Sequence, residues 1–261
     1  MFKSLILMLS LMALSGCATG PSANSEFSSK ESLLIQTNNY PQLVNLYKEE
    51  LRTQESKALR IKLSDAYLKA GDAESALFYI APITQSSEVL VSALMIQAHS
   101  QYELGDLARA VETIKRLESA GKLTAEGENL AGVIYAGQGQ YSLAKHYFNL
   151  SREHLFDDIK VKNNLAVIDM VENDYKKAVQ RLLPIYLNEQ ADDQVIANLT
   201  LAMAKLGNFE YVKSILGSSY THEEAIERFA ALKNAKVVEP TSENLAIKHM
   251  KADTDENPSQ P

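Results

Sequence analysis

Residues 131–148 read AGVIYAGQGQYSLAKHYF, and the pattern in this stretch decides the fold. Apolar residues recur at spacings of three and four on both sides of Gly139, which is typical of two amphipathic helices. Glycine adopts a positive φ without steric penalty, so Gly139 ends the first helix and opens a turn. Gly132 and Ala144, one in each helix, are small enough to let the two helices approach closely.

The turn recurs with a fixed period of 34 residues. Successive units place at this position Gly71, Gly105, Gly139, Asn173 and Gly207. Five residues later the first four units have a small residue, at Ala76, Ala110, Ala144 and Ala178, whereas the fifth unit has Val212. A period between about 20 and 50 residues is typical of solenoids, and 34 is the tetratricopeptide (TPR) period. The chain therefore resembles TPR proteins over five units, residues 57–219.

The resemblance implies an all-α solenoid, a right-handed superhelix of antiparallel helix pairs. One such pair cannot bury its apolar face alone, so the units must stack. The alternative is an irregular helical bundle, which would need five coincidences in register. Composition favours a helical core, because 46% of the residues are hydrophobic and strand signals are nearly absent. The net charge of −7 gives no electrostatic footprint for nucleic acid.

The first residues are typical of an export signal. Residues 1–16 combine a basic start at Lys3 with an apolar core of about ten residues, which is too short to span a bilayer. Removing these residues changes the net charge to −8, because Lys3 is lost. The segment ends in Leu14-Ser15-Gly16-Cys17, which resembles the lipobox of bacterial lipoproteins, and Cys17 is the only cysteine. The alternative is a plain signal peptide followed by an incidental cysteine.

The lipoprotein resemblance implies that Cys17 becomes the N-terminus and carries a diacylglycerol and an acyl chain, a stable anchor. No other cofactor is expected. Ala18 follows where an Asp would resemble the signal for inner-membrane retention. We therefore expect the periplasmic face of the outer membrane in a Gram-negative cell. Residues 17–30 are rich in small polar side chains and predict a flexible tether.

Both ends of the repeat array differ from its units. Residues 31–56 predict a degenerate helix pair, interrupted at Asn38-Asn39-Tyr40-Pro41, that caps the array. Residues 220–235 predict a C-terminal capping helix, in which Thr221 and Glu224 match a capping box. Residues 236–261 are polar and contain proline, so they predict a disordered tail.

The sequence contains no catalytic pattern, and we expect no enzyme activity and no metal. Gly137-Gln138-Gly139 lacks the rest of a phosphate-binding fingerprint and fits a repeat turn. Asp157-Asp158 and Asp192-Asp193 are paired carboxylates between units, where they cap the helices that follow. The histidines lack metal-ligand spacing: His99, His146, His154, His222 and His249.

Binding is the better prospect, because the first helix of each TPR unit lines a concave groove. The repeat register predicts these groove residues: Asp65, His99, Asn129, Lys160, Asn163, Asn164, Asn198 and Lys205. Asparagine amides both donate and accept, so they pair with the backbone of an extended peptide, or else with neighbouring repeats or water. Lys160 and Lys205 are placed beside Asp169, so the groove is mixed in sign. The alternative surface is the exterior of second helices, around Tyr175, Leu183 and Tyr186.

Four motifs add a finer resemblance. They are Asn163-Asn164-Leu165-Ala166, Tyr175-Lys176-Lys177-Ala178, Leu182-Leu183-Pro184 and Asn198-Leu199-x-Leu201-Ala202, with Pro184 expected to close the second helix of its unit. With Cys17, this pattern is similar to TadD-type TPR lipoproteins of the tight-adherence (Flp pilus) secretion system. The resemblance implies a non-enzymatic assembly factor whose protein partner is the outer-membrane secretin or another pilus component. Two alternatives remain: a type IV pilus pilotin, and an NlpI-like envelope adaptor for peptidoglycan hydrolases or a protease.

Overall fold

The computed structural model describes residues 23–217 and 220–236, and within them it contains thirteen α-helices and no strand. The helices are α1 (Ala23–Gln36), α2 (Tyr40–Thr53), α3 (Lys57–Lys69), α4 (Ala73–Thr84), α5 (Val91–Glu103), α6 (Leu107–Ser119), α7 (Ala125–Gly137), α8 (Tyr141–Glu153), α9 (Asp158–Val171), α10 (Tyr175–Leu187), α11 (Asp193–Lys205), α12 (Phe209–Leu216) and α13 (His222–Asn234). The expectation of an all-α TPR solenoid is confirmed.

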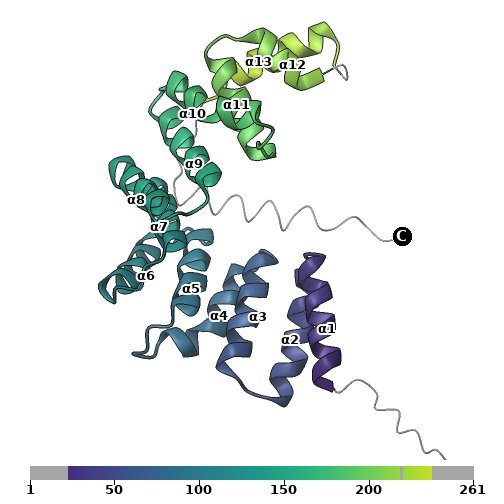
Figure 1. Cartoon of the computed structure of the whole chain (residues 1–261), viewed down its shortest axis with the longest axis vertical. Helices are drawn as coiled ribbons and strands as arrows, with labels where there is room; N and C mark the ends of the chain where they lie inside the picture. Colours follow the sequence, from purple (N-terminus) through teal and green to yellow (C-terminus); the bar gives the residue numbers. More distant parts are fainter. Residues whose placement is uncertain (1–22, 218–219, 237–261) are drawn as a thin grey trace, which may run out of the picture.

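The helices pair into hairpins that follow one another along an arc, from α1 and α2 at one end to α12 and α13 at the other (Figure 1). Each helix packs on the next, and the first helices of neighbouring units also contact one another: α3 with α5, α5 with α7, α7 with α9, and α9 with α11. These first helices therefore form a continuous layer, with α7 on the inner side of α6 and α8 (Figure 1).

The repeat turn has one backbone conformation in all five units. Its φ angles are 87°, 74°, 72°, 64° and 82° at Gly71, Gly105, Gly139, Asn173 and Gly207. Asn173 replaces glycine because asparagine tolerates the left-handed region better than other side chains. In four of the five units the side chain of the next residue caps the second helix, as Asp72 does by accepting from the Ser75 amide at 2.9 Å; Gln140 in the third unit makes no such bond.

The N-terminal pair forms a sixth hairpin of the same kind. Asn38 has a φ of 51° and Asn39 caps α2, so this turn matches the turns of the regular units. Helix α1 begins at Ala23, and residues 23–30 are therefore helical rather than part of a tether, which corrects our expectation. Glu31 accepts from the Tyr47 hydroxyl at 2.7 Å and from Lys62 Nζ at 2.8 Å, which joins this hairpin to α3.

A second periodic turn joins the units to each other. Gly121, Leu155 and Glu189 lie 34 residues apart and have φ angles of 62°, 65° and 57°. The residue type differs in each unit, so the sequence did not reveal this turn.

Inside the hairpins, close packing occurs where the sequence placed small residues. A Cβ atom at Gly132 would lie 2.5 Å from the ring of Phe148, and Ala144 is fully buried. The two largest core clusters meet at α9, which contributes Leu165 to one and Ala166 to the other. A bulkier residue at Leu165 or Ala166 would disrupt the packing of two units at once.

One position pair varies in chemistry among the first four units. The first and second helices are joined there by a Tyr67–Tyr79 stack at 5.3 Å, a Thr113–Gln101 hydrogen bond at 2.7 Å, a Tyr135–Tyr147 stack at 5.3 Å and an Arg181–Asp169 ion pair at 2.5 Å. Asp169 is therefore buried inside its hairpin and does not face the groove beside Lys160 and Lys205, as the sequence had suggested.

Other local predictions have mixed outcomes. Asp157 and Asp192 cap α9 and α11, and the Thr221–Glu224 capping box is present, so these predictions are confirmed. Pro184 lies inside α10, which continues to Leu187, so the expectation that Pro184 closes the helix is wrong. Packing of α10 on its neighbours outweighs the loss of one backbone hydrogen bond.

Several expectations fall on residues outside the described ranges. They are the signal segment 1–16, Cys17 with the tether up to residue 22, and the tail from residue 237 onward. Of the helices in residues 23–217 and 220–236, none combines the length and the apolar character that crossing a bilayer requires.

Candidate functional site

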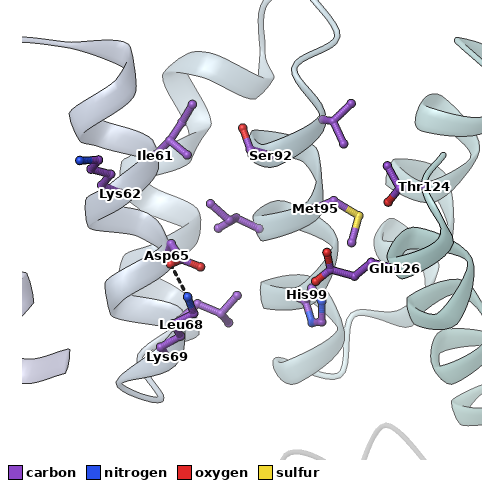
Figure 2. A pocket seen from close by; sticks show the side chains of 12 residues that line it. Ile61, Lys62, Asp65, Leu68, Lys69, Ser92, Met95, His99, Thr124 and Glu126 are labelled. Atoms are coloured by element: carbon purple, nitrogen blue, oxygen red, sulfur yellow. Dashed lines mark hydrogen bonds and ion pairs between the residues drawn. The ribbon is translucent and has the colours of Figure 1, made fainter. Parts of the chain in front are cut away.

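A hollow with a volume of about 930 Å³ lies on the inner layer, between α3, α5 and α7. Figure 2 shows side chains from all three helices pointing into it. Its apolar lining is Ile61, Leu68, Val91, Met95 and Ile96, and its polar lining is Lys62, Asp65, Lys69, Ser92, His99, Thr124 and Glu126. A concave, mostly apolar site with a few polar groups is the usual form of a binding site.

The repeat register explains the apolar lining. Ile61 and Met95 occupy the same position in successive units, and the next two units place Asn129 and Asn163 there. The side chain at this position faces the inner layer in each unit, so its type decides whether the groove wall is apolar or polar. The hollow lies at the two units in which this side chain is apolar, Ile61 and Met95.

Most charges in the hollow are paired. Lys69 Nζ lies 2.7 Å from Asp65 Oδ2, as the dashed line in Figure 2 shows, and Lys62 is paired with Glu31. Burial alone would raise the pKa of Glu31, but hydrogen bonds from Lys62 and Tyr47 outweigh it and hold that pKa below its ordinary value. Glu126 differs, because within the described part of the chain its carboxylate has no hydrogen bond or ion pair.

His99 lies beside Glu126 in the hollow (Figure 2). Burial lowers the pKa of His99, and the nearby carboxylates of Glu126, Glu103 and Asp65 oppose this shift without cancelling it. The imidazole is therefore neutral at pH 7. The hollow presents to a ligand an apolar lining, a neutral imidazole and one carboxylate without a partner.

Two of the residues predicted for the groove, Asp65 and His99, line this hollow. Four asparagines instead bond to each other across neighbouring units. Asn164 Nδ2 donates to Asn129 Oδ1 at 3.0 Å, and Asn198 Nδ2 donates to Asn163 Oδ1 at 2.8 Å. The structure thus displays the alternative in which the asparagines bond to neighbouring repeats. Each amide keeps further hydrogen-bonding capacity, since it offers two donors and an acceptor with two lone pairs.

The two predicted lysines are in different settings. Lys160 is 66% exposed and lies 3.8 Å from Asp157. Lys205 Nζ donates to the carbonyl of Lys233 at 2.9 Å and to the carbonyl of Ala235, so it satisfies the C-terminal end of α13. Neither lysine lines the hollow.

The apolar lining and Glu126 are residues that our sequence reasoning missed. The signal was available, because Ile61, Met95 and Asn129 share one register position and only the polar member was selected. Burial of apolar surface supplies most of the energy of binding, so the apolar side chains at this position matter more to a ligand than the polar one.

The alternative surface on the second helices is only partly exposed. Tyr175, Leu183 and Tyr186 are half-buried and pack against the core of their own and the next unit. Tyr186 meets Tyr211 edge-on at 5.8 Å. Stacking of the fifth unit covers part of these side chains, and a binding surface there stays a prediction.

The described residues contain no group of three or more His, Cys, Asp or Glu side chains able to hold a metal ion. His154, one of the histidines considered above, bonds through Nδ1 to the buried Glu128 at 2.8 Å. That contact joins the C-terminal end of α8 to α7.

Comparisons with known proteins agree with this geometry at the level of the fold. No protein-family model and no curated protein matches the chain. A tetratricopeptide repeat protein from Parabacteroides merdae aligns over 86% of this chain and 98% of its own, with a TM-score of 0.59 and 14% identity. MamA (41-end) from Desulfovibrio magneticus RS-1 covers 64% of this chain and 96% of its own, with a TM-score of 0.52 and 14% identity.

A chain of the APC/C hetero-tetramer Cut9-Hcn1 covers 88% of this chain with a TM-score of 0.60 and 17% identity. This chain spans 46% of that one. At such identities the likeness shows the fold, and the protein is a TPR-type helical solenoid.

Proposed function

We propose that the protein is a non-enzymatic docking scaffold that holds a peptide segment of a protein partner in the hollow between α3, α5 and α7. The observation that supports this most is the apolar lining, because five apolar side chains surround a hollow large enough for several side chains of a ligand. Its paired charges orient a ligand and contribute little affinity, since ion pairs at a protein surface are worth about 0–1 kcal/mol.

We further propose the setting in which this scaffold acts. Cys17 is acylated and anchors the chain at the periplasmic face of the outer membrane. The motifs shared with TadD-type lipoproteins support a role in tight-adherence pilus assembly, with the secretin or another pilus component as the partner. Helix α1 begins six residues after Cys17, so the solenoid starts close to the anchor.

The test is secretin assembly in cells. Cells without the protein, or with Cys17→Ser, should lose the heat-sensitive secretin multimer or retain it in the inner membrane. Ser92→Trp places a bulky ring in the hollow from an exposed position on α5, and it should reduce the multimer. Ser142→Trp on the exposed surface of α8 is the matched control and should have no effect.

Normal multimer in all of these strains would overturn the pilus role. Co-purification of cell-wall hydrolases or a protease, lost in Ser92→Trp, would then indicate the envelope adaptor. Equal partner capture by Ser92→Trp and Ser142→Trp would overturn the docking site itself.

A further inference from the structure

The described chain ends against the inner layer of the solenoid. The carbonyls of Lys233 and Ala235 both accept from Lys205 Nζ. Lys205 on α11 holds the same register position as Lys69 on α3, and Lys69 lines the hollow. The segment after Ala235 therefore starts at the layer of first helices and not on the outer face.

That segment is long enough to reach the hollow. Residues 237–261 number twenty-five, and an extended chain spans about 3.3 Å per residue, or roughly 80 Å in all. Packed helices lie about 8–10 Å apart, so four steps from α11 to α3 cover roughly 40 Å.

The two lysines of the segment are complementary to Glu126, the unpaired carboxylate of the hollow. From α9 to α3 the layer presents Lys160, which is near Asp157, then the unpaired Glu126, and then Lys62 and Lys69, which are paired with Glu31 and Asp65. Along the segment the complementary charges are Glu239 and Glu243, then Lys248 and Lys251, then Asp253, Asp255 and Glu256.

The apolar residues of the segment are complementary to the apolar lining of the hollow. Leu245, Ile247 and Met250 flank the two lysines, so the apolar and basic part of the segment coincides with the apolar lining and Glu126. Burying one aliphatic side chain contributes about 1.5–3 kcal/mol.

We propose that residues 245–256 of the chain occupy the hollow as an intramolecular ligand, with Lys248 or Lys251 paired to Glu126. A tethered segment has an effective concentration in the millimolar range, so an external peptide must displace it to bind. This second consequence rests on the proposed docking function, whereas occupancy by the segment does not.

The experiment is zero-length carbodiimide cross-linking of the full chain, which joins only carboxylates and amines in direct contact. The expected products join Lys248 or Lys251 to Glu126, and Asp253, Asp255 or Glu256 to Lys62 or Lys69. Glu126→Gln should remove the first product. Glu112→Gln, on the exposed face of α6, is the matched control and should leave it unchanged.

Three results would overturn the proposal. One is the absence of products between the segment and Glu126. Another is an equal yield of products at Glu112. The last is formation of the products between isotopically labelled and unlabelled molecules, which would indicate exchange between two copies.

Partner capture separates this proposal from the docking function. Lys248→Glu combined with Lys251→Glu should abolish the Glu126 product and raise partner capture about tenfold or more, because the competing segment is released. Cross-links without any effect of Ser92→Trp on capture would overturn the docking function alone. Loss of capture in Ser92→Trp without cross-links would overturn the segment's role alone.

Discussion

The inner layer has two walls of opposite chemistry built on the same repeat. On α3 and α5, one register position holds Ile61 and Met95, and a hollow of about 930 Å³ opens there. On α7 and α9 the same position holds Asn129 and Asn163, and each amide bonds to an amide of the following unit. The first wall has apolar surface for a ligand, whereas the second uses part of its polar capacity internally.

The side-chain pairs inside the hairpins of the two halves also differ, with an aromatic stack in the first half and an ion pair in the second. In α7 and α8 the variable pair is a stack of Tyr135 on Tyr147, whereas in α9 and α10 it is Asp169 with Arg181. The repeat fixes where two side chains meet and leaves their chemistry open. Units of one solenoid can therefore specialise without a change of fold, because each position has only local partners.

The largest expected change in stability comes from breaking the buried ion pair between Asp169 and Arg181 in the second half. Arg181→Met leaves Asp169 buried with only Lys177 at 3.4 Å, and we expect a loss of about 3–5 kcal/mol in unfolding free energy. Adding Asp169→Leu removes the unpaired charge and should restore most of the loss. Urea unfolding of both variants measures this. Equal stability of the single and double variants would mean that the carboxylate is not a buried charge.

Overpacking tests the hairpin at the junction of the two halves. Ala144→Leu on α8 should cost about 1–3 kcal/mol, because Ala144 is fully buried where α7 and α8 approach closely. Ala108→Leu on the exposed face of α6 is the matched control and should change stability little. An unchanged melting temperature for Ala144→Leu would contradict the packing described here.

The asparagine pairs give a smaller effect that separates the two walls. Asn164→Ala with Asn198→Ala removes both pairs, and we expect a loss of about 1–2 kcal/mol in unfolding free energy. Partner capture through the hollow should change less than in Ser92→Trp. A loss of capture as large as that of Ser92→Trp, with stability unchanged, would move the binding site to the asparagine wall.

The smallest effect concerns pH. Burial lowers the pKa of His99 in the folded protein, so the unfolded state binds the proton more tightly. Stability should fall as the pH drops below about 6.5, the ordinary histidine pKa, toward the lower folded value. His99→Gln should flatten this dependence between pH 7.5 and pH 5, as followed by the melting temperature. An identical slope in both proteins would contradict a buried neutral imidazole.

Much of the fold follows from local chemistry that a sequence displays. The turns at Gly139 and Asn173 can be recognised in the sequence because few residues tolerate a positive φ. The capping box of Thr221 and Glu224 can be recognised because its two residues have a fixed spacing. Gly132 and Ala144 are found because close helix packing excludes larger side chains. Each of these constraints acts within one unit, so a period of 34 residues was enough to predict all five units.

The rest depends on contacts between units, which no local pattern records. Asp169 looked like a groove residue until its partner Arg181 was placed across the hairpin. Lys205 looked like a free cation in the groove, but its ammonium group donates to the carbonyl of Lys233 at the end of α13. The sequence by itself therefore determined the repeat and its turns, because those are local. Only the tertiary structure decided which inward-facing side chains remain available to a ligand, because that depends on what the neighbouring helices already bind.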